Sequence, residues 1–485
     1  MSISGTIASA LSGLTVAARA AEVVSSNVAN ARTAGYARRT LEIAPRAVGA
    51  AGQGVQAVAV LRATDPIVTG DRRLAEAGAA ERQTRADFLS GIESLLGRPE
   101  EEGSITARIA AFDAALVEAS SRPDADTRLS AVVESARGIM RNLSAAANEV
   151  QRARETADGQ IGASVRQIND ALAGIADFNA QILSLNSTDR DTSALMDQRQ
   201  RLIDGISELV PLREVDRGQG LIALYSVGGA VLIDGGRPAV LGFTAAGVVT
   251  AEMTQTSGAL SGLTLNGRSI STAAEGSLSG GKLSAQFALR DSVGPGVQSE
   301  LDTLARDLVE RFSDPAVDTT LTPGNPGIFT DLGGPFVPAN TAGLSLRLRL
   351  NPAVDPNQGG QLWRIRDGVE AIAPGPTGNS RLLVALNDAL NAPRLPSSGS
   401  SGAGARSHSV LAGQIVSSIA SGRLTAETEA SYSTARAEAL RSLELENGVD
   451  TDRELQDLLM IEQSYAANAR VLQTVDDMIQ ILLGV

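Results

Sequence analysis

The chain has 485 residues, of which 43% are hydrophobic and only 3% aromatic, and its formal net charge is −13. The length allows about two to four domains, and the hydrophobic content excludes a wholly disordered chain. The acidic balance argues against nucleic-acid and anionic-membrane partners, and the absence of cysteine excludes disulfides and thiolate metal sites.

Residues 1–30 predict a helix with one apolar stripe. Its members recur in steps of four and three, the a/d spacing of a coiled coil. They are Ile7, Leu11, Leu14, Ala18, Ala21 and Val28, with Ser25 as the only polar position. Gly35 can then supply the positive φ that ends a helix. The first residues lack the basic start and continuous apolar stretch of a signal peptide, and no apolar run approaches the roughly 18 residues of a membrane helix.

Residues 37–70 are mixed, and the weak alternation of residues 55–61 predicts a short strand in a linking segment. From residue 71 to about residue 212 the apolar residues recur at helical spacing, with breaks at Pro99 and Pro123. This pattern predicts an antiparallel helical bundle, made by residues 37–212, 283–313 and 410–446.

The period changes to two after residue 212, which predicts a β-rich insert at residues 213–282 with a hairpin at 221–233. Residues 314–396 predict an irregular segment with strands at 344–350 and 361–366. Residues 397–409 form a Gly/Ser linker that holds the only histidine, His408. A lone histidine in such a linker is expected to be solvated.

Residues 447–485 predict a second terminal helix, capped by Asp450 or Thr451, with Glu454 completing a capping box. Its stripe is broken only at Asn468. The members are Leu458, Ile461, Tyr465, Leu472, Val475, Ile479 and Leu482. Two interpretations stay open: the terminal helices complete this chain's own core, or they pack against copies of it. Asn27, Asn30 and Asn468 accordingly either cap helix ends or set the register between packed helices.

No catalytic, cofactor or metal site is predicted. With one histidine and no cysteine, the common zinc sites and Ser-His or Cys-His pairs cannot be assembled. Residues 218–223 fit a loose dinucleotide fingerprint, but they precede a predicted hairpin where the fingerprint needs a helix. The predicted fold class is therefore mainly α with a β insert: terminal coiled-coil helices at 1–36 and 447–485, a long helical bundle, and one or two small β-rich domains.

Residues 10–14, 27–30 and 33–36, together with residues 463–476, resemble the N- and C-terminal signatures of the bacterial flagellar rod, hook and hook-associated proteins. Ala34 departs from the pattern, since that family usually has proline there. The resemblance assigns assembly roles to two sets of residues. They are Leu11, Leu14, Asn27, Asn30, Thr33, Gly35 and Tyr36 at the N-terminus, and Tyr465, Asn468, Leu472, Thr474, Ile479 and Leu482 at the C-terminus.

The resemblance implies a structural protein, not an enzyme, that leaves the cell by type III export and joins the extracellular flagellum. It implies a ring-like homo-oligomer, contacts with the hook protein and the next junction or filament protein, and an export chaperone, without nucleic acid or membrane insertion. Residues 194–203 and 275–283 and the helical bundle favour a hook-associated member that joins hook to filament. The alternatives are a hook or rod protein, which would have β structure at 71–212, and a secreted helical adhesin or effector.

Overall fold

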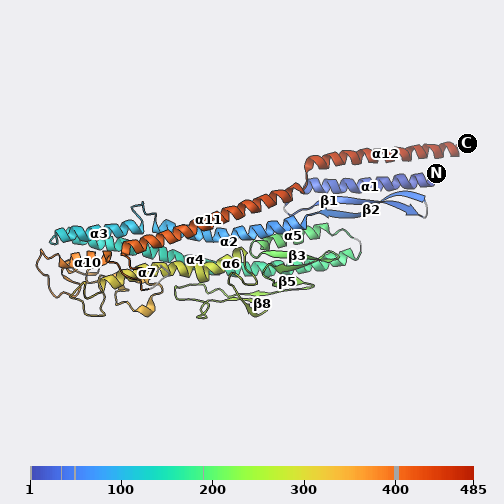
Figure 1. Cartoon of the computed structure of the whole chain (residues 1–485). Helices are drawn as coiled ribbons and strands as arrows, with labels where there is room; N and C mark the ends of the chain where they lie inside the picture. The colour runs from blue at the N-terminus through green and yellow to red at the C-terminus, as the bar shows by residue number, and fades with distance from the viewer. Residues whose placement is uncertain (1–2, 34, 49–50, 189, 398–403, 485) are drawn as a thin grey trace.

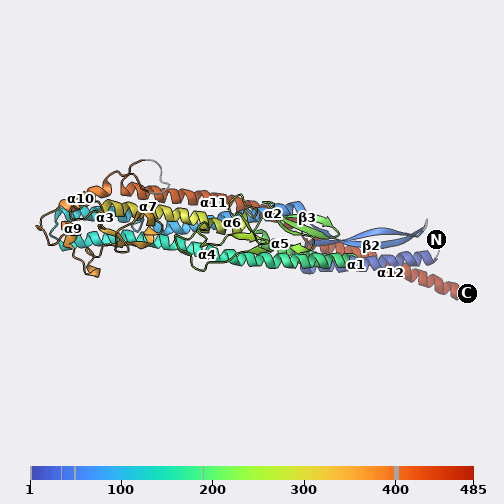
Figure 2. The same cartoon turned by 90° about the horizontal axis from the view of Figure 1, so that it is seen from below.

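The computed structural model describes residues 3–33, 35–48, 51–188, 190–397 and 404–484. The molecule is elongated, its long helices run along its length, and both termini lie at the same end (Figures 1 and 2). It is mainly helical with small antiparallel sheets, which confirms the predicted fold class.

One end of the molecule, which we call the terminal module, consists of the two terminal helices and a hairpin. These are α1 (Ile3–Asn30), α12 (Thr451–Leu483), β1 (Arg38–Val48) and β2 (Ala51–Ala63). The helices α1 and α12 lie side by side and run in opposite directions, and the hairpin lies along α1 (Figure 1). For the hairpin, sequence patterns predicted only a short strand at residues 55–61, because apolar and polar residues do not alternate strictly along most of β1.

The remaining elements, which we call the body, are built on long helices. They are α2 (Pro66–Leu96), α3 (Ile105–Ser121), α4 (Asp126–Asn186), α5 (Ser193–Ser207), α6 (Gly281–Ala288), the π-helical turn η1 (Leu289–Val293), α7 (Gly294–Phe312) and α11 (His408–Glu446). Asp65 accepts hydrogen bonds from the backbone N–H groups of Ile67 and Val68, and Pro66 stands at the first helical position, so α2 begins there. The predicted helices at 71–212 are confirmed, with breaks where the prolines were noted.

A four-stranded and a three-stranded sheet lie beside the middle of the body. Their strands are β3 (Leu212–Gly218), β4 (Leu221–Ser226), β5 (Val231–Asp234), β6 (Arg237–Pro238), β7 (Leu241–Gly242), β8 (Leu263–Leu265) and β9 (Arg268–Ile270). The predicted hairpin is the β4–β5 pair, in which Leu224 faces Ile233. Residues 218–223 span the β3–β4 turn and the start of β4, with positive φ at Gly218 and Gly220, as expected of turn glycines.

The end far from the termini combines short elements around an aromatic core. They are β10 (Phe329–Asp331), η2 (Pro338–Asn340), α8 (Leu344–Arg347), β11 (Leu348–Leu350), η3 (Pro356–Gln358), α9 (Trp363–Asp367) and α10 (Arg381–Asn391). The rings of Phe112, Phe312 and Phe329 pack edge to face with centroids 5.3–6.0 Å apart.

Two strand predictions in this region are wrong. Only the last three residues of 344–350 are β structure, because buried Asp302 accepts from the N–H groups of Gly343 and Ser345 and holds a helical turn. Residues 361–366 lie mostly in α9, which Gly368 ends with a φ of 121°.

The expectation that His408 is solvated is also wrong, since it is fully buried at the start of α11. Its Nδ1 lies 2.8 Å from Oδ2 of Asp307, which also accepts from Nε of Arg311. Burial lowers the pKa of His408, so the neutral ring is favoured at neutral pH. The composition of residues 397–409 hid this contact, and residues 398–403 of the predicted linker lie outside the described residues.

By length and composition alone, α1 is apolar enough to cross a membrane, which the spaced apolar residues did not lead us to expect. Core helices of other proteins meet the same criterion. In this structure part of α1 is covered by α12 and the hairpin.

Candidate functional site: the terminal helix pair

Two contacts set the register of α1 against α12. Nδ2 of Asn27 donates to Oε2 of Glu454 over 2.9 Å. Gly13 lies against Asn468, because a Cβ at Gly13 would stand 2.7 Å from Nδ2 of that asparagine. The two contacts lie two heptads apart on both helices, which fits an antiparallel pair in constant register.

Asn27 is the centre of a buried polar cluster. Besides its bond to Glu454, Nδ2 donates to the carbonyl of Arg39, and Oδ1 accepts from the Arg39 N–H and the Tyr36 hydroxyl. Four bonds satisfy the whole side chain, which is only 1% exposed. Asn27 therefore ties α1 to both β1 and α12, in line with the register-setting interpretation.

The other two seam asparagines bond within their own helices. Nδ2 of Asn30 donates to the Ser26 carbonyl and its Oδ1 accepts from Thr33, which is the local, helix-end interpretation. Nδ2 of Asn468 donates to the Ser464 carbonyl, so its contact with Gly13 is one of packing.

Glu454 is a site residue that the sequence analysis assigned wrongly. Asp450 alone caps α12, accepting from the N–H groups of Asp452 and Arg453. The Glu454 carboxylate instead accepts from Asn27 and, over 2.6 Å, from Nε of Arg38. A signal was available: Glu454 stands four residues before Leu458, so it lies on the face of α12 that carries the apolar stripe.

The N-terminal stripe lies at the edge of the α1–α12 contact. Leu11 is 57% exposed, and Ala18 is also exposed. Ile7, Leu14 and Ala21 are half-buried. The buried face of α1 is a different one, and it carries small side chains. Its residues are Ala10, Val16, Ala17, Val23, Val24 and Asn27.

The C-terminal stripe faces α1 more directly. Val475 is buried, and Leu458, Ile461, Leu472 and Ile479 are half-buried, while Tyr465 is 48% exposed. The side chain of Leu482 lies outside the described residues. Further large apolar side chains of α12 are each at least 40% exposed: Leu455, Leu459, Met460, Val471, Met478 and Ile481.

The other predicted residues shape the ends of the helices. Gly35 has a φ of 74° in the turn after α1, and a Cβ there would stand 2.6 Å from Cγ of Arg201 on α5. Thr33 is exposed, Ala34 lies outside the described residues, and the Thr474 hydroxyl donates to the Arg470 carbonyl of its own helix. The positive φ of Gly35 and its close approach to Arg201 both require glycine in the turn after α1.

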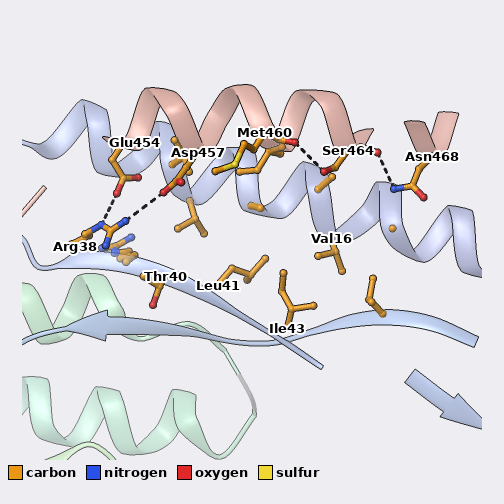
Figure 3. Close-up of a pocket in the computed structure, with 18 residues that line it drawn as sticks. Val16, Arg38, Thr40, Leu41, Ile43, Glu454, Asp457, Met460, Ser464 and Asn468 are labelled. Atoms are coloured by element: carbon orange, nitrogen blue, oxygen red, sulfur yellow. Dashed lines mark hydrogen bonds and ion pairs between the residues drawn. The ribbon is translucent and has the colours of Figure 1, made fainter. Parts of the chain in front are cut away.

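A groove of about 490 Å³ runs between α1, α12 and the hairpin. Figure 3 shows Glu454 and Asp457 reaching towards Arg38 at one end, with Met460 and Ile43 further along. The walls are mainly apolar. Among the described residues, no group of three or more His, Asp or Glu side chains could hold a metal ion.

Comparisons with known proteins match both ends and the middle of the chain. The family described as flagella basal body rod protein matches residues 7–36, and the C-terminal family of the flagellar basal body rod proteins FlgE, FlgF and FlgG matches residues 446–485. The helical domain of flagellar hook-associated protein FlgK matches residues 89–327. The chain belongs to the flagellar axial family of rod, hook and hook-associated proteins. The two rod matches coincide with α1 and α12, the helix pair described above.

Individual relatives of this axial family agree. Flagellar hook-associated protein 1 of Salmonella typhimurium is 28% identical over 240 residues, which are 48% of this chain and 43% of that protein. Flagellar hook-associated protein 1 of Bacillus subtilis is 25% identical over 44% of this chain and 45% of its own length. The matches therefore span less than half of these relatives.

A solved structure, the flagellar hook junction protein FlgK from Burkholderia pseudomallei, is similar over 54% of this chain and 46% of that chain. The sequence identity is 20% and the TM-score is 0.44. The family is one of structural flagellar proteins.

Proposed function

We propose that the chain is a structural protein of the extracellular flagellum that joins hook to filament. In this proposal α1 and α12 of many copies pack into a tubular core, and the body forms outer layers. The relatives' name, hook-associated protein 1, and the match to the FlgK helical domain support this assignment.

The observation that carries the proposal is the uncovered apolar surface of the terminal module. Leu11 on α1 and Leu459 on α12 are 57% and 58% exposed, and Ile481 is 68% exposed. Burying a large aliphatic side chain is worth roughly 1.5–3 kcal/mol. Neighbouring copies that cover this surface would therefore gain stability from a face that is exposed to water in one chain.

The partners follow from the same proposal. They are further copies in a ring, the hook protein on one side, and the next junction or filament protein on the other, with a chaperone holding the chain before export. The predicted residues of both signatures, such as Leu14, Leu472 and Ile479, would belong to the packed core.

Two substitutions in the source bacterium test assembly. Leu11→Glu and Leu459→Glu each place a charge on the uncovered face, and we expect cells whose hooks carry no filament. The matched control is Ile372→Glu, because Ile372 is fully exposed but lies in the body. The readout is electron microscopy of cells, with labelled antibody to locate the wild-type protein.

The outcomes separate the alternatives. Label between hook and filament supports the proposal, and label along the rod or hook favours a rod or hook protein. Label spread over the cell surface, with normal filaments in both variants, favours an adhesin and would overturn the proposal.

Export gives a second test. Deleting residues 1–40 should abolish release into the medium, because the resemblance places the export information there. Undiminished release would contradict this part of the proposal.

A further inference from the structure

The boundary between the terminal module and the body has few connections. The chain crosses it at residues 64–65, between β2 and α2, and at residues 447–450, between α11 and α12. Figure 1 shows the module extending past the end of the body, and β2 approaches the body at α5. Side chains at this point must therefore hold the module in its orientation.

Asp197 of α5 stands at this point and is 3% exposed. Its Oδ1 accepts from Nε of Arg62 on β2 over 2.9 Å, and its Oδ2 accepts from a terminal nitrogen of Arg39 on β1 over 3.2 Å. One carboxylate of the body thus binds both strands of the module.

The two arginines need this carboxylate. Arg39 and Arg62 are direct partners in the antiparallel ladder. Like charges directly opposite each other destabilise a strand pair, and Asp197 lies between the two guanidinium groups and offsets their repulsion. The positive charges of Arg39 and Arg62 at the base of the hairpin therefore have their counter-charge only when the hairpin is docked on α5.

The contact extends through the module to α12. The backbone of Arg39 exchanges two hydrogen bonds with Asn27, which donates to Glu454. A continuous set of bonds thus runs from Asp197 on the body to the first turn of α12.

We propose that Asp197 is a positioning residue that fixes the orientation of the terminal module on the body. The inference goes beyond the proposed assembly function, since it concerns the isolated chain. Removing the carboxylate leaves two facing arginines without a counter-charge. The module then changes its orientation relative to the body about its two connections, residues 64–65 and 447–450.

Asp204 supplies a matched control on the same helix. Its Oδ1 also accepts from two arginines, Arg72 over 2.8 Å and Arg73 over 2.7 Å. Both of these arginines belong to α2, within the body. Neutralising Asp204 therefore removes the same chemistry without touching the boundary.

The test is a distance measurement between two spin labels by pulsed electron paramagnetic resonance on the full chain. The chain has no cysteine, so Glu22→Cys on α1 and Asp170→Cys on α4, both exposed, give one label in each part. We expect one narrow distance distribution for the parent and for Asp204→Asn. For Asp197→Asn we expect a distribution at least twice as wide.

A distribution for Asp197→Asn as narrow as that of the parent overturns the proposal, and so does equal widening by Asp204→Asn. Circular dichroism checks that each variant is folded. If Asp197→Asn does not fold, Arg62→Met removes one of the two arms and leaves Arg39 paired. It should still widen the distribution, and an unchanged width overturns the proposal.

Discussion

The body and the terminal module are both helical, but they are held together differently. The body buries large side chains in two cores, one of which includes the ring cluster of Phe112, Phe312 and Phe329. The buried apolar residues of α1 are all alanine or valine, and the buried centre of the module is the polar pair Asn27 and Glu454. From this difference we expect the body to be stable by itself, whereas the module combines a specific register with unburied apolar surface.

The largest effect should come from the body's core. Replacing Phe312 by alanine removes a 1% exposed ring and leaves a cavity, so we expect a loss of about 3–5 kcal/mol. Urea unfolding followed by circular dichroism measures it. The control Ile372→Ala, at a fully exposed position, should stay within about 0.5 kcal/mol. Equal losses would show that the ring cluster is not the centre of the core.

The next effect should be confined to the module. Glu454→Gln leaves Arg38 without its 2.6 Å carboxylate partner, which should cost about 1–3 kcal/mol. Hydrogen exchange should quicken in α1 and α12 and stay unchanged in α4. The control Asp457→Asn removes a more exposed carboxylate, 3.6 Å from the same arginine, and should cost less than about 1 kcal/mol. Faster exchange in α4 would contradict the separation of the two parts.

The wild-type chain offers a comparison without substitution. Because the module buries little large apolar surface, we expect amides of α1 and α12 to exchange at least about tenfold faster than those of α4 at residues 129–182 in dilute monomer. In isolated hook–filament junctions the terminal amides should become protected. Equal protection in the monomer would place the terminal helices in the same stable unit as the body.

The smallest effect near neutral pH should come from His408. Burial holds its pKa below the ordinary value of 6.5, so below that pH the unfolded chain binds a proton that the folded chain resists. Its contribution to stability is therefore complete above pH 6.5 and is lost as the pH falls. An asparagine at this position keeps a hydrogen-bond donor for Asp307 but does not titrate. As the pH falls from 7 to 5, the free energy of unfolding of His408→Asn should therefore decrease less steeply than that of the wild-type chain.

Three partly or fully buried carboxyls change stability with pH in the opposite direction. Burial raises the pKa values of Glu81, Glu300 and Asp302, so these carboxyls favour the folded state as the pH falls. They are common to both proteins, so the difference in slope reports His408 together with Asp307, whose pKa the hydrogen bond from His408 lowers against the opposing effect of burial. Identical pH profiles from chemical unfolding would contradict its role.

Local patterns predicted much of the fold. Helical periodicity, the prolines at 99 and 123 and the Asp450 cap of α12 act within a few residues of each other, so a sequence window contains them. The same holds for Gly35, whose positive φ is a local requirement.

Only the tertiary structure decided the roles of Glu454, Asp197 and His408. The partners Asn27 and Glu454 are 427 positions apart in the chain, and no periodicity connects them. A charged or ionisable side chain can be buried only where folding brings it a partner. Sequence by itself therefore determined the long helices, and packing determined which of their faces are buried and which polar groups lie between them.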